Sequence, residues 1–189
     1  MLSSKLFCFA LVSLVFGHIY LAASEETIAV CPPDFVQVAG KCLFVDIFNK
    51  RFYDADRHCQ SLNAGLLSIK NKREFDAINE WLSTVTPQSK EFWTSGNKLG
   101  GTENYYWQST GMKAIYIPWN VGQPIATAGD CLALANVTTT AEATTTGVYR
   151  LSVKPCTSWA PLICQAPLQI FKTQLCLNTT AFFEAKVPA

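Results

Sequence analysis

Apolar residues recur at helical spacing from Tyr53 to Leu62. Ala55, Cys59 and Leu62 fall on one face of a helix, because they are separated by three or four positions. Asp54 lies near the start of the run, where a carboxylate interacts favourably with the helix dipole. The run ends at Asn63-Ala64-Gly65, which is typical of a helix terminus, so the pattern predicts a first helix here.

A second helix is predicted from about Lys72 to Ser83. Asn71 in the N-cap position and Glu74 three residues later resemble a capping box, in which each side chain bonds to an amide group of the other residue. The apolar stripe of this helix consists of Phe75, Ile78, Trp81 and Leu82.

The rest of the pattern indicates strands. Phe35 to Val38 and Leu43 to Val45 are short β-favouring runs on either side of Ala39-Gly40-Lys41, which predicts a hairpin. Further runs are Phe92-Trp93, Tyr105-Tyr106-Trp107, Tyr149 to Val153 and Leu162-Ile163-Cys164. Two helices followed by many strands predict an α+β domain with antiparallel sheets.

The first residues have the composition of a signal peptide. Lys5 precedes an apolar run from Leu6 to Tyr20, and small residues follow at Ala22 and Ala23. We therefore exclude residues 1–23 from the fold and expect a secreted, extracellular protein. The run is shorter than the roughly 20 residues of a membrane span, and no second such run follows, so no membrane anchor is expected.

Charge and length limit the function further. The chain has 15 basic and 14 acidic residues, and removing residues 1–23 takes away one basic residue, Lys5, so the remainder is neutral. A neutral domain has no electrostatic attraction for nucleic acid. About 166 residues suit one domain, which we assign to residues 31–165, with 166–189 as a C-terminal tail.

Seven of the eight cysteines remain when Cys8 leaves with the signal peptide. Disulfides are the default in an oxidising compartment. No Cys-x-x-Cys pair is present and His58 is the one histidine left, so a thiolate metal site is not expected. An odd number leaves one cysteine over, and the residues alone fix neither that cysteine nor the pairing. Cys176 is the outlier by position, and it could be free or could link two chains, as in a disulfide-linked dimer.

Two N-glycosylation sequons are present. Asn136-Val137-Thr138 lies in a threonine-rich stretch from Asn136 to Gly147, which we expect to be a solvated hairpin loop, and Asn178-Thr179-Thr180 lies in the tail. Both asparagines are candidate sites of modification. The tail also carries Ile170, Phe171, Leu175 and Leu177 around Cys176, which suggests either a short packed helix or a partner-binding segment.

The order of these elements resembles the long form of the C-type lectin-like domain, over Cys31 to Gln165, and is similar to secreted insect C-type lectins. The matching segments are Leu66-Leu67-Ser68-Ile69, Glu74 to Leu82, Phe92-Trp93-Thr94-Ser95-Gly96, Trp119-Asn120-Val121-Gly122-Gln123-Pro124, Asp130-Cys131-Leu132 and Leu162-Ile163-Cys164-Gln165. The resemblance implies three intradomain disulfides, Cys31–Cys42, Cys59–Cys164 and Cys131–Cys156.

In the sugar-binding members of this family a calcium ion is held by a Glu-Pro-Asn or Gln-Pro-Asp loop, by an acid just before the next cysteine and by a Trp-Asn-Asp run. Here the loop reads Gln123-Pro124-Ile125, Gly129 stands where a glutamate is usual, and Leu151-Ser152-Val153 occupies the Trp-Asn-Asp position. Gln123 alone of the five expected side-chain ligands survives, and Ser152 offers one weak neutral oxygen. Calcium needs about six to eight oxygens, so no metal and no other cofactor is expected.

The surviving motif is expected to shape the loop. Trp119 should be buried, and a cis bond before Pro124 is feasible. The candidate ligand-binding residues are Gln123, Asn120, Asp130, Tyr106 and Tyr116.

The hypothesis is a secreted recognition module that binds a glycan or an extracellular protein without the usual calcium-coordinated sugar site. Two alternatives remain: a calcium-dependent lectin of the galactose type, whose motif begins Gln-Pro, and a disulfide-linked structural or inhibitory subunit. No nucleophile, paired acids or phosphate-binding loop indicates an enzyme.

Overall fold

The computed structural model describes residues 27–85, 91–101, 103–137, 148–178 and 181–188, and of residues 173–178 and 181–187 it describes the backbone alone. The chain divides into two compact units, one of Cys31–Pro167 and one of Met1–Val30 with Leu168–Ala189. Within the described residues, no helix combines the length and the apolar character needed to cross a bilayer.

The two helices of the larger unit are those that the pattern predicts. Helix α1 spans Phe52–Ser61 and α2 spans Lys72–Val85. At the start of α2 the side chain of Asn71 accepts a hydrogen bond from the Glu74 amide at 3.0 Å, as the capping box requires. The return bond of the box is different, because the Glu74 carboxylate accepts from the amide of Lys70 at 2.6 Å and pairs with Lys41 at 2.9 Å.

The strands of the larger unit form one mixed sheet in the described residues. Its order is β2-β3-β10-β5-β6-β7, with β4 paired to β10, β8 to β5 and β9 to β8. The predicted hairpin is β2 and β3, and β10 runs parallel to β5 and antiparallel to β3. The strand bounds are β2 Val36–Val38, β3 Lys41–Lys50, β4 Gly65–Leu66, β5 Glu91–Asn97, β6 Tyr106–Trp107, β7 Met112–Lys113, β8 Cys131–Val137, β9 Val148–Lys154 and β10 Ala160–Ala166.

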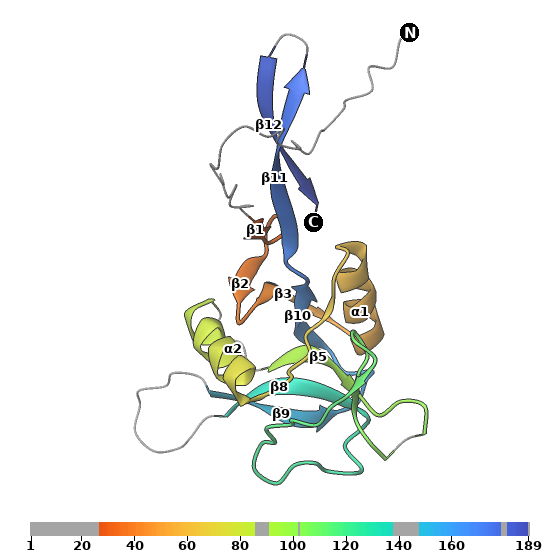
Figure 1. Ribbon diagram of the computed structural model, residues 1–189. Coiled ribbons are helices and arrows are strands. Elements are labelled where there is room, and N and C mark those ends of the chain that lie inside the picture. The colour runs from red at the N-terminus through yellow and green to blue at the C-terminus, as the bar shows by residue number, and fades with distance from the viewer. Residues whose placement is uncertain (1–26, 86–90, 102, 138–147, 179–180, 189) are drawn as a thin grey trace. The chain divides into compact units, whose positions relative to one another are not determined.

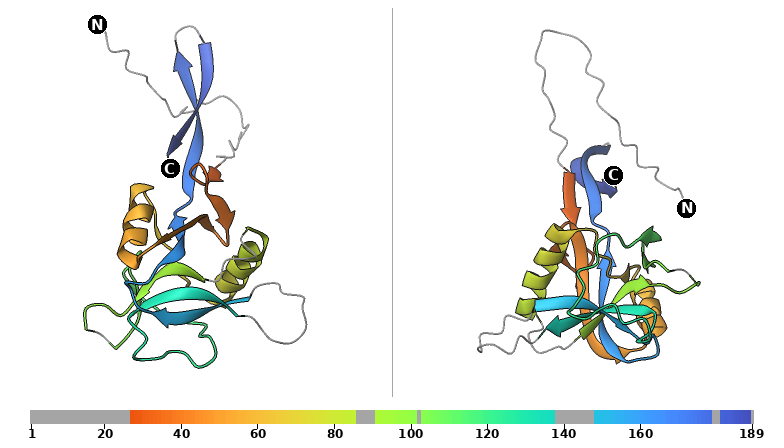
Figure 2. Two further views of the ribbon diagram at one scale, coloured as in Figure 1. Left: turned by 180° about the vertical axis from the view of Figure 1, so that it is seen from behind. Right: turned by 90° about the horizontal axis from the view of Figure 1, so that it is seen from below.

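The helices lie to either side of β3 and β10 (Figure 1). The connection from β5 to β8, residues 98–130, is drawn in green to teal beside β5, β8 and β9, and all of it but residue 102 is described (Figures 1 and 2). It contacts both helices, since Gln108 donates a hydrogen bond to Asp56 of α1 at 2.8 Å and the Tyr116 ring packs against Phe75 of α2. We call residues 98–130 the long loop. Two apolar clusters hold these layers together: Phe75, Ile78 and Leu82 of α2 pack with the β8–β9 side chains, while Phe52 and Cys59 of α1 pack against Trp93 and Leu162.

Three disulfides join Cys31 to Cys42, Cys59 to Cys164 and Cys131 to Cys156, the pairs that the family resemblance implies. The second closes a loop of 105 residues and fixes α1 to β10. The long-form fold with its three bonds is therefore confirmed.

The smaller unit contains a three-stranded antiparallel sheet of β1 (Thr27–Val30), β11 (Gln169–Asn178) and β12 (Ala181–Pro188). A helix in the tail is thus wrong: residues 169–178 form strand β11, which pairs with β1 on one side and with β12 on the other. Cys176 and Asn178 lie in β11, where the backbone alone is described, so the roles predicted for their side chains lie outside the described residues.

The first two residues of the predicted threonine-rich loop, Asn136 and Val137, belong to strand β8. Asn136 is the sixth residue of β8 and pairs with Tyr149 of β9. Its predicted place in a loop is therefore wrong, because β8 continues as far as Val137; residues 138–147 lie outside the described part of the chain.

Candidate ligand-binding site on the long loop

The long loop runs against β9 at the motif that the resemblance singles out. The Asn120 amide donates to the carbonyl of Leu151 at 2.8 Å, and the Leu151 amide donates to the carbonyl of Pro118 at 2.9 Å. These bonds place Leu151-Ser152-Val153 beside Trp119–Gln123. Trp119 is partly buried rather than buried, and it packs edge-on against Tyr105 with ring centroids 5.4 Å apart.

Gln123 uses its side-chain oxygen to hold the loop. The Oε1 atom accepts from the amide of Val153 at 3.0 Å and from the amide of Ile125 at 3.2 Å. The Gln123–Pro124 peptide bond is cis, as the sequence suggested. An amide oxygen has two lone pairs, so both acceptor sites of the one surviving ligand type are occupied by backbone donors.

Asn120 and Ser152 are also engaged. The Asn120 Oδ1 atom accepts from the amide of Val121 at 2.8 Å, and its Nδ2 donates to the Ser152 hydroxyl at 3.4 Å. The structure thus brings Gln123, Asn120 and Ser152 together at β9, and the side-chain oxygens of Gln123 and Asn120 accept hydrogen bonds from backbone amides. Val153, which stands in place of the aspartate of the Trp-Asn-Asp run, has its side chain buried in the core.

Gly129 lies where the family places a glutamate, and its backbone leaves no space for a side chain. Its φ angle is 129°, in the region that L-residues rarely adopt. A Cβ atom there would lie 2.6 Å from the carbonyl carbon and oxygen of Lys154 and from the nitrogen of Pro155. A carboxylate at this position is therefore excluded by the close approach of two backbone segments.

Asp130 forms an ion pair with Lys98, with 3.5 Å between carboxylate oxygen and Nζ, and the Lys98 amide donates to the Asp130 carbonyl. Burial, and then the negative charge of Asp130, raise the pKa of Tyr105, so the Tyr105 phenol stays protonated at neutral pH. In the described residues no group of three or more His, Cys, Asp or Glu side chains is arranged to hold a metal ion.

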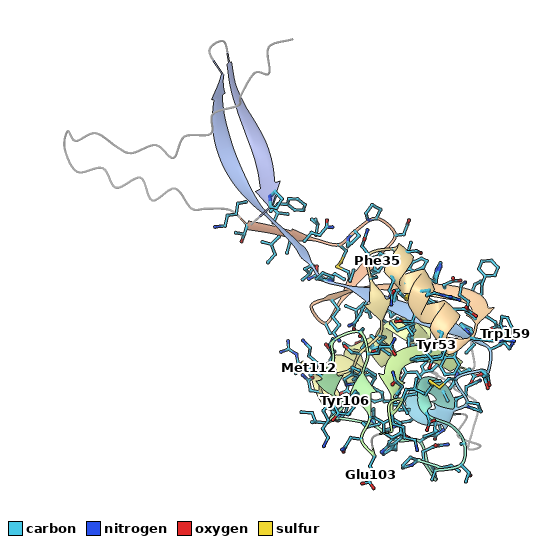
Figure 3. The ribbon with its side chains drawn as sticks, turned by 90° about the vertical axis from the view of Figure 1, so that its right-hand side faces the viewer. Phe35, Tyr53, Glu103, Tyr106, Met112 and Trp159 are labelled. Atoms are coloured by element: carbon cyan, nitrogen blue, oxygen red, sulfur yellow. A yellow bond between two sulfur atoms is a disulfide. The ribbon has the colours of Figure 1, made fainter. Side chains whose placement is uncertain are left out.

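The long loop exposes several large apolar side chains among its polar ones. Val121 is 95% exposed and Ile115 is 85% exposed, and Ile125 is also exposed at the position of the family's second ligand. Tyr106 and Met112 lie near each other on the β6–β7 hairpin (Figure 3). Tyr116, predicted as a surface residue, is half-buried because its ring packs edge-on against Phe75 of α2, so it contributes less surface than Tyr106.

Sequence reasoning identified the missing ligand types but not the reason that they are missing. The backbone conformation of Gly129 and the bonds of the Gln123 oxygen depend on contacts between residues 25 to 30 positions apart. The one signal in the sequence was a glycine directly before Asp130, since glycine is the residue that tolerates a close backbone approach.

The family model for the lectin C-type domain matches residues 48–166, and the chain belongs to that family. Two relatives from Drosophila melanogaster are similar: C-type lectin 37Db is 24% identical over 132 residues, which cover 69% of this chain and 80% of the relative. C-type lectin 37Da is 32% identical over 124 residues, covering 62% of this chain and 63% of the relative. Among solved structures, human lithostathine superposes with a TM-score of 0.62 at 20% identity, over 73% of this chain and 91% of that one, which shows a shared fold.

Proposed function

We propose that this C-type lectin domain is an extracellular recognition module that binds a glycan or a protein through the long loop without coordinating calcium. The observation that carries the proposal is the state of the family's metal position: the Gln123 oxygen is saturated by two amides, and backbone atoms fill the space beside Gly129. A hard cation that needs about six to eight oxygens has too few ligands there.

The surface of the long loop suits contact by apolar and aromatic groups. Tyr106, Met112 and Ile115 present hydrocarbon to solvent on or directly after the β6–β7 hairpin, while Val121 and Ile125 do so at the motif. Tyrosine combines a large apolar ring with a hydroxyl donor, so Tyr106 can contact the apolar face of a sugar ring or the side chains of a protein. Binding rather than catalysis is the proposed activity.

Secretion is part of the proposal. The apolar segment Leu6–Tyr20 followed by small residues supports it from the sequence. The three disulfides add support, because such bonds persist in oxidising compartments outside the cytosol.

Calcium titration by isothermal calorimetry tests the metal part of the proposal. We expect no binding heat up to about 1 mM calcium, the range of extracellular calcium-binding modules. A glycan and protein array probed in calcium and again in chelator then tests ligand recognition, and we expect the same ligands in both. Chelator-sensitive binding would contradict the proposal and favour a calcium-dependent lectin.

The contact surface is tested by Tyr106→Ala on any array ligand. We expect Tyr106→Ala to weaken binding by about fivefold or more, because exposed tyrosines are frequent energetic centres of interfaces. Val148→Ala is the matched control, since Val148 is exposed at the first residue of β9. Equal binding by wild type and Tyr106→Ala would contradict the proposal that the ligand binds to the long loop.

A further inference from the structure

A second exposed surface is created by a bulge in β3. Leu162 of β10 pairs with Asp46 and Ala160 pairs with Lys50, so residues 47–49 of β3 lie opposite the single residue Pro161. Proline has no backbone N–H and cannot continue the ladder, which explains why the pairing is interrupted at this point. The bulge releases Ile47 and Phe48 from the sheet, and they are 63% and 73% exposed.

Two further exposed aromatic residues are close to the bulge along the chain: Tyr53 follows Lys50 by three residues, and Trp159 directly precedes Ala160, the partner of Lys50. Tyr53, in the first turn of α1, is 54% exposed, and Trp159, in the turn before β10, is 57% exposed. Figure 3 shows both on the larger unit. Arg51 is close to both of these aromatic residues. It directly precedes α1, which contains Tyr53, and its guanidinium Cζ lies 5.2 Å from the centroid of the Trp159 ring. We define the Arg51–Trp159 surface as Phe48, Arg51, Tyr53 and Trp159.

Arg51 is the one cation of this surface without an acidic partner among the described residues. Lys50 pairs with Asp46 at 2.8 Å, and Arg57 pairs with Asp54. The Arg51 side chain has no ion pair or hydrogen bond in the described structure and caps no helix amide. Stacking on Trp159 orients its guanidinium, whose N–H groups match the two oxygens of a carboxylate.

We infer that the Arg51–Trp159 surface binds a protein segment that presents an Asp or Glu side chain beside apolar side chains. The Arg51 guanidinium, which has no acidic partner among the described residues, can bind one carboxylate of the partner, and the exposed rings of Phe48, Tyr53 and Trp159 offer area for apolar contacts. Tryptophan, tyrosine and arginine are the residues that most often dominate protein–protein binding energy. The inference is independent of the long loop.

A polyanionic polysaccharide fits this surface less well. Such a ligand gains affinity from many cations at once, but Lys50 and Arg57 are already neutralised by Asp46 and Asp54, which would also repel a second and third acidic group. A second copy of the chain in a two-fold arrangement would have to place one of its own acids opposite Arg51, and Asp46 and Asp54 near this surface are already paired with Lys50 and Arg57.

The experiment selects a phage-displayed random peptide library on the full secreted chain, with the Trp159→Ala variant as the counter-selection target. We expect enriched peptides in which an acid neighbours aromatic or aliphatic residues. Binding of a synthetic enriched peptide, followed by fluorescence anisotropy, should weaken about tenfold for Trp159→Ala and about fivefold for Arg51→Gln. Added salt should weaken the peptide complex of wild type and leave that of Arg51→Gln nearly unchanged.

Arg57→Gln is the matched control, because it removes an exposed arginine of α1 that already has an acidic partner, and its peptide affinity should stay within about twofold of wild type. Trp159→Phe keeps an aromatic ring and should retain most of the binding, which separates ring loss from misfolding of Trp159→Ala. Peptides without acids, or peptides that bind Trp159→Ala as well as wild type, would overturn the inference. If the selection yields no peptide, and the chain instead binds heparin through Arg51 or self-associates through Trp159, the inference is also wrong.

Discussion

Adding a single methyl group at Gly129 tests whether the backbone at this position excludes a side chain. In Gly129→Ala the new Cβ would lie 2.6 Å from three backbone atoms of Lys154 and Pro155, about 1 Å inside normal contact. Backbone atoms cannot rotate away, and the neighbouring Cys131–Cys156 disulfide restrains both segments. Overpacking of this kind costs about 1–3 kcal/mol, and the φ of 129° adds about 1–3 kcal/mol for a residue with a side chain.

The free energy of unfolding should therefore fall by about 4 kcal/mol in Gly129→Ala. Gly111→Ala is the matched control, because Gly111 also has a positive φ, of 70°, but a Cβ added there would meet no atom within 4 Å beyond its chain neighbours. Its cost is conformational alone, about 1–2 kcal/mol. Urea denaturation followed by tryptophan fluorescence measures both values, and the difference of about 2–3 kcal/mol is the steric part.

Equal destabilisation by the two alanines would refute the reasoning, since it would mean that the Lys154 backbone moves aside freely. Calcium binding by a Gly129→Glu variant would refute it more directly. A carboxylate at 129 that binds the ion without loss of stability would show that the position is open and merely lacks the side chain.

Three further predictions concern stability. Replacing Cys59 and Cys164 together by alanine should lower the free energy of unfolding by about 4–5 kcal/mol in the loop-closure model, because their bond closes 105 residues; calorimetry measures it. Burial raises the pKa of Asp56, so the folded state retains a proton that the unfolded state releases, and stability should fall as the pH rises through the raised pKa; Asp56→Asn should remove that fall, measured by urea titrations from about pH 3 to about pH 7. Lys41→Met should cost about 3–5 kcal/mol in urea denaturation, because it leaves the buried carboxylate of Glu74 without its cation.

Each of these has a clear contrary result. Unfolding of the cysteine variant at the wild-type temperature would mean that chain entropy contributes little. If the pH dependence of stability is unchanged in Asp56→Asn, another group is responsible for it. If Lys41→Met is as stable as Lys41→Arg, then water replaces the lost ion pair at Glu74 without a cost in stability.

The fold could be predicted from the sequence where local pattern and packing agree. Ala55 and Cys59 of α1 and Phe75, Ile78 and Leu82 of α2 are buried as predicted, and the Asn71 cap forms as the sequence indicates. Leu62 is an exception, because it follows the last residue of α1 and is exposed. Residues 169–178 group their apolar side chains at Ile170-Phe171 and Leu175–Leu177 and carry no period-two signal, so the strand that they form depends on its pairing with β1 and β12. The partner, β12, begins directly after Thr179-Thr180, a pair without the glycine or proline that would signal a hairpin in the sequence.

The candidate site was predictable in its residue types and not in its geometry. Ile125 and Val153 have no side-chain oxygen, which is visible in the sequence. That the Gln123 oxygen bonds to β9, or that Tyr116 turns toward Phe75, depends on long-range packing that no local pattern encodes. The Arg51–Trp159 surface was missed for the same reason, since Arg51 and Trp159 lie far apart in the sequence and meet only in the folded chain.

The bond from the Val153 amide to the Gln123 side chain affects the conditions under which a ligand dissociates. A binding loop that is shaped by a metal collapses when the ion is withdrawn or its carboxylates are protonated, so such a protein can release cargo in an acidic or calcium-poor compartment. A carboxamide neither titrates in the biological range nor depends on dissolved ions. We therefore expect the ligand affinity of this domain to change little on mild acidification or on removal of calcium.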